Sequence, residues 1–168
     1  MINPQAQQPF TGRLLTGTDW FETYYRGERV ALLATGAEAA TILPELLHTA
    51  ASVTVFEESP TWVTPVRIPT RRLRRLASKA YLRVSVRDPW LRRQLTPHRF
   101  DSHRTQASPS YYTALQDPRT RLVHWPAYAI VTQGVRATDG VEYRFDTIVV
   151  GTTSRFAGTE QPTQKEVG

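Results

Sequence analysis

The clearest alternation of apolar and polar positions lies between residues 29 and 57. It begins with an apolar run at 29–33, typical of a strand buried in a parallel sheet. It ends with a β-branched run at 52–57, which predicts a second strand. Between them, apolar residues at helical spacing predict one stripe of a helix: Ala39, Ile42, Leu43, Leu46, Leu47 and Ala50. The pattern predicts a βαβ unit whose helix is kinked at Pro44, where one hydrogen bond is lost at a usual cost of about 3 kcal/mol.

Downstream, the pattern predicts a helical segment and then short strands. Residues 70–84 place their apolar side chains on one helical face and most of their arginines on the other. Asp88 and Pro89 are typical of an N-cap and a first helical position, so a second helix should follow. Its predicted buried side consists of Trp90, Leu91 and Leu95. The remaining predicted elements are a helical turn at 111–115, strands at 121–123, 127–131 and 147–150, and a hairpin turning at Asp139–Gly140.

Length and composition place the chain among single-domain globular proteins. It has 168 residues, 40% of them hydrophobic, and a mean hydropathy of −0.41. We expect an N-terminal arm at 1–28, an α/β domain at 29–156 with a helical insertion at about 68–116, and a loose tail at 157–168. No apolar run approaches the roughly 20 residues that cross a membrane, and the first residues do not read as a signal peptide. The lack of cysteine excludes disulfides and thiolate metal sites and suits the cytoplasm.

The net charge of +6 changes this picture little. Lys79 and Lys165 are the only lysines among 21 basic residues, and we interpret the arginine excess as the codon bias of a GC-rich genome. The run at 71–75 could contact nucleic acid. It has no interleaved aromatic residues, however, so a solvated helix face is favoured. We expect neither a nucleic acid nor a membrane partner, and no metal, because neither zinc-ligand nor P-loop spacing is present.

Five blocks of sequence resemble, in order, the NADPH-binding domain of flavin-dependent monooxygenases of the Baeyer–Villiger type. They are Phe10-Thr11-Gly12 with Trp20; Val55-Phe56 with Ser59-Pro60 and Trp62; and residues 88–97, 111–115 and 146–150. The resemblance runs from Phe10 to about Phe156 and implies an α/β, Rossmann-like three-layer domain with a mostly parallel sheet. In that family, FAD-binding segments lie on both sides of this domain. The chain has no N-terminal Gly-x-Gly-x-x-Gly, so the resemblance covers the nucleotide domain alone.

The turn after the first predicted strand is a damaged form of the fingerprint Gly-x-Gly-x-x-Gly/Ala. The glycines of this fingerprint let the chain turn tightly and approach a pyrophosphate. Its three positions are Ala34, Gly36 and Ala39, of which Ala34 departs. Glu57, about 20 residues past the turn, could bind a ribose 2′-hydroxyl and favour NAD. If a nucleotide binds, the expected contacts are Thr35, Gly36, Ala37, Glu57 and Ser59.

Two glutamates oppose a phosphorylated coenzyme. Glu38 puts a carboxylate in the first turn of the predicted helix, where unpaired N–H groups attract anions. There the carboxylate would stabilise the unpaired N–H groups of its own helix and repel a diphosphate. Glu58 stands where the resemblance implies an arginine for the 2′-phosphate of NADP, and a carboxylate there is repulsive. For Glu57 and Glu58 a solvated acidic loop is the favoured interpretation, NAD binding comes second and NADP binding last.

Three more positions depart from the family that the chain resembles. Thr16, Thr153 and His103 replace its histidine, its glycine and an NADPH-binding lysine. Arg104 matches the arginine that, in Baeyer–Villiger enzymes, stabilises the peroxyflavin. With His103 and Asp101 it could form an acid–base or oxyanion cluster, and an arginine on a flexible loop is an equal alternative. The candidate catalytic region consists of Arg104, His103, Asp101, Tyr111 and Tyr112.

Two functions fit these observations. In the first, the protein is freed from redox work and needs no cofactor. It would be a tailoring enzyme of the cyclase or isomerase type, or a ligand-binding accessory protein, acting on a small organic intermediate of secondary metabolism. In the second, it is the NAD(P)H-binding subunit of a split monooxygenase whose FAD comes with a separate chain. Because an isolated domain tends to cover the surface of a lost partner, a homodimer is also expected.

Overall fold

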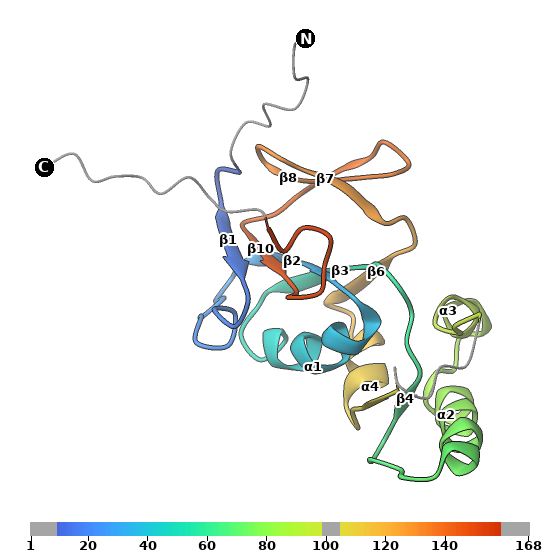
Figure 1. Ribbon diagram of the computed structural model, residues 1–168. Coiled ribbons are helices and arrows are strands. Elements are labelled where there is room, and N and C mark those ends of the chain that lie inside the picture. The colour runs from blue at the N-terminus through green and yellow to red at the C-terminus, as the bar shows by residue number, and fades with distance from the viewer. Residues whose placement is uncertain (1–9, 99–104, 159–168) are drawn as a thin grey trace, which may run out of the picture.

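The computed structural model describes residues 10–98 and 105–158 of the chain (Figure 1). Its centre is a five-stranded parallel sheet with the strand order β1-β10-β2-β3-β6. In that order, the strands are Arg13–Thr16, Thr147–Val150, Arg29–Ala34, Ser52–Glu57 and Thr120–Val123. Because every pair is parallel, all five strands have their carboxyl ends at one side of the sheet, which we call the carboxyl edge.

The predicted βαβ unit is confirmed. It consists of β2, helix α1 at Gly36–Leu46, and β3, with Leu33 of β2 in register with Phe56 of β3. Residues 30–34 are fully buried, which explains why this strand is a continuous apolar run rather than an alternating one. The central sheet has a hydrophobic core on each face, and successive side chains of β2 point into different cores. Val30 and Leu32 pack on the face that the helices cover, and Ala31 and Leu33 pack on the other face.

The two cores define three layers, so the predicted α/β class with a mostly parallel sheet is confirmed (Figure 1). Helices α1 and α4, the latter at Tyr111–Leu115, pack on one face of the central sheet. A three-stranded antiparallel sheet packs on the other face, and its strands are β7 Ala127–Val131, β8 Gly134–Ala137 and β9 Glu142–Arg144. The predicted hairpin joins β8 to β9, and Gly140 adopts φ +84° in its turn.

One strand of the central sheet was not predicted. Residues 13–16 form β1, which pairs with β10 at the edge of the sheet. The expected N-terminal arm therefore contributes a strand to the sheet. Only four residues take part, and the first of them, Arg13, is exposed, so the local pattern gives little signal for a strand.

Pro44 lies inside α1, as the sequence indicated, and its missing N–H leaves the Ala40 carbonyl without its usual helical donor. The buried Ser108 hydroxyl donates a hydrogen bond of 2.8 Å to that carbonyl. Ser108 follows the two-residue strand β5 at Gln106–Ala107, which pairs with β4 at Val63–Thr64. A distant side chain thus replaces the helical bond that the proline removes.

Helix α2 at Arg71–Ser85 presents its apolar face to solvent. The side chains of Leu73, Leu76 and Val84 are 58%, 67% and 81% exposed, whereas Ser78 and Leu82 are buried. The helix is held on its other side, where the Tyr81 hydroxyl donates to the Pro109 carbonyl at 2.8 Å. The apolar face that the sequence predicted therefore exists, but nothing in the described part of the chain covers it.

Helix α3 at Pro89–Gln94 begins as predicted, because the Asp88 carboxylate accepts a hydrogen bond of 2.9 Å from the Trp90 nitrogen. Its predicted buried side is only partly right. Leu95 is buried, but Trp90 is half exposed and meets the His124 ring edge-to-face, with 5.6 Å between ring centroids. With six residues, fewer than two turns, the helix is too short to bury a continuous face.

Candidate functional site

The candidate site lies at the carboxyl edge, where open α/β sheets bind their ligands. Three segments meet there: the turn from β2 into α1, the segment after β3, and residues 151–155 after β10, which we call the β10 loop. Gly36 lies in the first segment, and its nitrogen donates to the Ser59 carbonyl at 2.9 Å. A Cβ at Gly36 would lie 2.5 Å from Glu57 Oε1 and 2.8 Å from the Ser59 carbonyl oxygen. The missing side chain of Gly36 therefore makes room for the protein's own segment after β3.

Glu38, in the first turn of α1, holds the β10 loop. Its carboxylate accepts hydrogen bonds from the hydroxyls of Thr152 at 2.5 Å and Thr153 at 2.7 Å, and from the Thr153 nitrogen at 3.2 Å. Burial opposes ionisation, but the hydrogen bonds from Thr152 and Thr153 outweigh it and lower the pKa of Glu38. The glutamate is therefore a carboxylate at neutral pH, placed where a helix N-terminus attracts anions.

Glu38 does more than stabilise its own helix. The N-cap residue, Thr35, makes no capping hydrogen bond, and the partners of the Glu38 carboxylate lie mainly on the β10 loop. The Thr35 hydroxyl lies 3.5 Å from Glu38 Oε2 and 3.2 Å from the Thr153 hydroxyl. The Glu38 carboxylate thus accepts hydrogen bonds from the β10 loop, which lies against the N-terminus of α1.

Glu58 makes a second tie to the β10 loop. It follows β3, and its carboxylate accepts from the Ser154 hydroxyl at 2.6 Å and from the Arg155 nitrogen at 3.3 Å. Its own nitrogen donates to the Ala34 carbonyl at 3.1 Å. The favoured interpretation of a solvated acidic loop is therefore wrong for Glu58, which joins the ends of β2, β3 and β10.

Glu57 is directed inward, toward the helical layer. Its carboxyl group accepts a hydrogen bond of 3.4 Å from the Tyr111 hydroxyl, and burial raises the pKa of Glu57 to about 7. Burial also raises the pKa of Tyr111. A solvated loop is therefore wrong for this residue as well. The carboxyl group contacts α4 rather than extending from the carboxyl edge toward a ribose.

The structure brings some of the predicted site residues together. Thr35, Gly36 and Ala37 form the turn and first residues of α1, beside Glu57 and the Ser59 carbonyl. Tyr111 and Tyr112 are buried in the helical core, with 5.6 Å between their ring centroids. Three residues of the predicted catalytic cluster lie outside the described part of the chain: Asp101, His103 and Arg104.

Sequence reasoning missed Thr152 and Ser154 as partners of the acidic residues. The signal was the run Thr152-Thr153-Ser154 directly after the last buried strand. Parallel strands end at a common edge, so these hydroxyl groups had to lie near the other strand ends. The acceptor of the Thr152 hydroxyl is Glu38, and the acceptor of the Ser154 hydroxyl is Glu58.

The fold and the fingerprint turn define the class of this protein as a Rossmann-like α/β domain. No protein-family model matches the chain. Its curated relatives include a Baeyer–Villiger monooxygenase from Streptomyces coelicolor, which is 28% identical over 94% of this chain and 38% of the relative. Another is a Baeyer–Villiger monooxygenase from Pseudomonas aeruginosa, 25% identical over 85% of this chain and 35% of the relative.

Solved structures show the same fold. An oxidized steroid monooxygenase bound to NADP aligns with a TM-score of 0.73 and 18% identity over 89% of this chain and 44% of that protein. A cyclohexanone-bound cyclohexanone monooxygenase aligns with a TM-score of 0.71 and 18% identity over 86% of this chain and 43% of that protein. The chain is thus similar in sequence and fold to Baeyer–Villiger-type flavin monooxygenases, and it spans less than half the length of the relatives it matches.

Proposed function

We propose that this protein performs a non-redox task on a small organic molecule, with a coenzyme site that its own side chains fill. The task is either that of a tailoring enzyme of the cyclase or isomerase type in secondary metabolism or that of a ligand-binding accessory protein. The observation that carries the proposal is the Glu38 carboxylate, which accepts hydrogen bonds from Thr152 and Thr153 at the N-terminus of α1. In this interpretation the carboxylate takes the place of a coenzyme phosphate.

Electrostatics support this proposal. Two unit charges of the same sign 4 Å apart repel each other by about 4 kcal/mol at the effective dielectric constant near a protein surface. A diphosphate at the α1 N-terminus would bring negative charge against ionised Glu38, and Glu58 would oppose the 2′-phosphate of NADP. To enter, the coenzyme would also have to displace the hydrogen bonds that both glutamates make to the β10 loop.

A calorimetric titration of the purified protein with NADPH and with NADH tests the proposal. We expect no binding of either coenzyme at millimolar concentration. The variant Glu38→Ala should gain binding of inorganic pyrophosphate, because it frees the donors of Thr152 and Thr153. Glu142→Gln, which removes a carboxylate from β9 in the opposite layer, is the matched control and should gain nothing. Saturable binding of NADPH or NADH by the unmodified protein contradicts the proposal.

A second candidate function is the NAD(P)H-binding subunit of a split monooxygenase that is completed by an FAD-binding chain. It is favoured by the uncovered apolar face of α2, since exposed apolar patches mark interaction surfaces. Solved relatives include a protein described in complex with both FAD and NADP. This alternative requires the unmodified protein to bind NADPH or NADH, so the same titration separates the two functions.

A further inference from the structure

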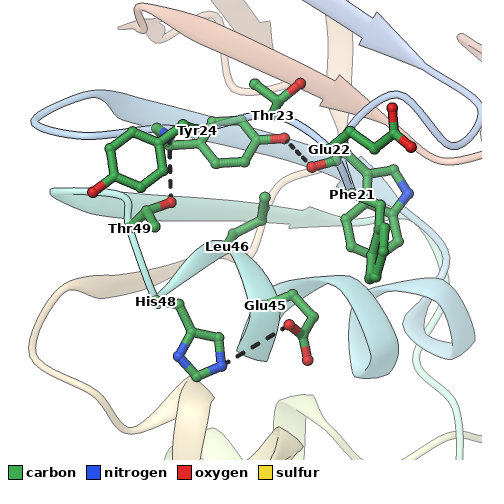
Figure 2. A pocket seen from close by; sticks show the side chains of 10 residues that line it. Phe21, Glu22, Thr23, Tyr24, Glu45, Leu46, His48 and Thr49 are labelled. Carbon is green, nitrogen blue, oxygen red and sulfur yellow. Dashed lines mark hydrogen bonds and ion pairs between the residues drawn. The ribbon is translucent and has the colours of Figure 1, made fainter.

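A pocket lies at the C-terminal end of α1, away from the carboxyl edge. It is formed between residues 20–25 and the C-terminal end of α1, with a volume of about 300 Å³ (Figure 2). This volume is at the lower end of the range for small-molecule sites. Aromatic rings of Trp20, Phe21 and Tyr24 line it. Phe21 and Tyr24 are 71% and 64% exposed, so their rings are accessible to a ligand.

The wall of this pocket is fixed by hydrogen bonds. The buried Tyr25 donates from its hydroxyl to the Trp20 carbonyl at 2.7 Å, and from its nitrogen to the Thr49 hydroxyl at 3.3 Å. The Thr23 hydroxyl donates to the Asp19 carbonyl at 2.7 Å. Residues 20–25 are thereby held against the end of α1, and the rings are placed before any ligand arrives.

Two carboxylates line the pocket, although the chain as a whole has a net charge of +6. They are the carboxylates of Glu22 and Glu45. His48 lies 3.9 Å from Glu45, with its Nε2 toward the carboxylate (Figure 2).

Neither lysine nor arginine is among the described residues that line the pocket. The Leu47 carbonyl at the end of α1 is not a free acceptor, because Arg119 donates to it at 2.8 Å. Arg13 lies behind the wall of the pocket, where it donates to the Tyr24 carbonyl at 3.2 Å and is paired with Glu28.

We propose that this pocket binds a small organic cation of the alkylammonium class. Aromatic faces attract such cations through their negative quadrupole, and carboxylates supply the complementary charge. The pocket combines both features, and its volume suits a compact group. It lies at the opposite end of α1 from Glu38, so the inference does not depend on the proposed function.

The test is a titration of the isotope-labelled full chain followed by ¹H–¹⁵N correlation NMR, at constant ionic strength. Choline chloride is the cation, and 3,3-dimethylbutan-1-ol is its neutral counterpart of the same shape. We expect saturable shifts at residues 20–25 and 45–49 with choline and much weaker binding of the alcohol. Equal binding of both compounds, or no saturable shift in these segments with choline, overturns the proposal.

Variants assign the binding to the rings and the charge. Tyr24→Leu should weaken choline binding about two- to fivefold, whereas Tyr24→Phe, which keeps the ring, should leave it nearly unchanged. Glu45→Gln should also weaken it, and Glu142→Gln, on the opposite layer, should not. The same spectra report whether each variant is folded. Unchanged affinity in folded Tyr24→Leu and Glu45→Gln refutes the assignment.

Discussion

Glu38 and Glu57, two glutamates near the carboxyl edge, differ in pKa because their partners differ. Glu38 faces hydroxyl and N–H donors of the β10 loop, and these bonds lower its pKa. Glu57 faces the buried Tyr111 and has one long hydrogen bond at 3.4 Å, too weak to compensate for burial. The donors available to each carboxyl group, rather than the residue type, decide its charge.

Glu57 should make the stability of the protein depend on pH. Burial raises its pKa from the ordinary value of 4.5 to about 7, so between these values the folded state binds more protons than the unfolded state. Stability should therefore fall as the pH rises through this window. Glu57→Gln should remove the decline and be more stable than the unmodified protein at about pH 8, by about 1–3 kcal/mol.

Urea denaturation across this pH range measures the effect of Glu57, with Glu142→Gln as the control. Parallel stability curves for Glu57→Gln and the unmodified protein would contradict the raised pKa. Glu38 has a lowered pKa and acts in the opposite sense, so its contribution is lost only as the pH falls further into the acid range.

At the scale of the element, α1 depends on a partner that is distant in sequence. Ser108→Ala should destabilise the protein by about 1–3 kcal/mol, because it leaves the buried Ala40 carbonyl without a donor. Pro44→Ala supplies an N–H that can reach the same carbonyl. The loss of Ser108 should therefore cost less in the Pro44→Ala background.

A double-mutant cycle measured by chemical denaturation quantifies this coupling between positions 44 and 108. We expect a coupling of about 1 kcal/mol, the size of one hydrogen bond. Identical costs for Ser108→Ala in the two backgrounds would show that the hydroxyl does not replace the bond removed by the proline.

At the scale of the whole molecule, α2 is the clearest candidate for self-association. Its exposed Leu73, Leu76 and Val84 would be covered in the homodimer that we propose. The helix is also rich in arginine and contains no acidic residue, so two copies repel each other at low salt. Dimer formation should therefore strengthen as salt screens this repulsion.

Light scattering at low and high salt tests for the dimer. Leu76→Gln should yield a monomer, whereas Val141→Gln, an exposed apolar residue before β9, should behave like the unmodified protein. A monomer at every salt concentration would exclude the homodimer.

Within the described residues, no helix is both long enough and apolar enough to span a bilayer.

The sequence predicted the parts of the fold that depend on local pattern. The β2-α1-β3 unit, the Asp88 cap and the hairpin at Asp139–Gly140 are each encoded within a few residues. The burial of α2 was not predictable, because a periodic pattern identifies an apolar face but not what lies beside it. Strand β1 is a strand only through its pairing with β10, more than 130 residues away.

The sequence singled out residues around the fingerprint turn but not their hydrogen-bond partners. The turn at Gly36 and the unusual acids Glu38 and Glu58 were visible in the sequence. Their partners in the β10 loop come from about 100 residues further along the chain. That contact depends on the strand order of the sheet, which puts β10 beside β2, and no local pattern contains this information.

A crystal structure of the protein soaked with NADP would test most directly whether its own carboxylates fill the coenzyme site. We predict that Glu38 remains hydrogen-bonded to Thr152 and Thr153, that Glu58 remains bonded to Ser154, and that the coenzyme does not enter the carboxyl edge. A diphosphate lying against Gly36, with the Glu38 carboxylate displaced from the β10 loop, would contradict the account.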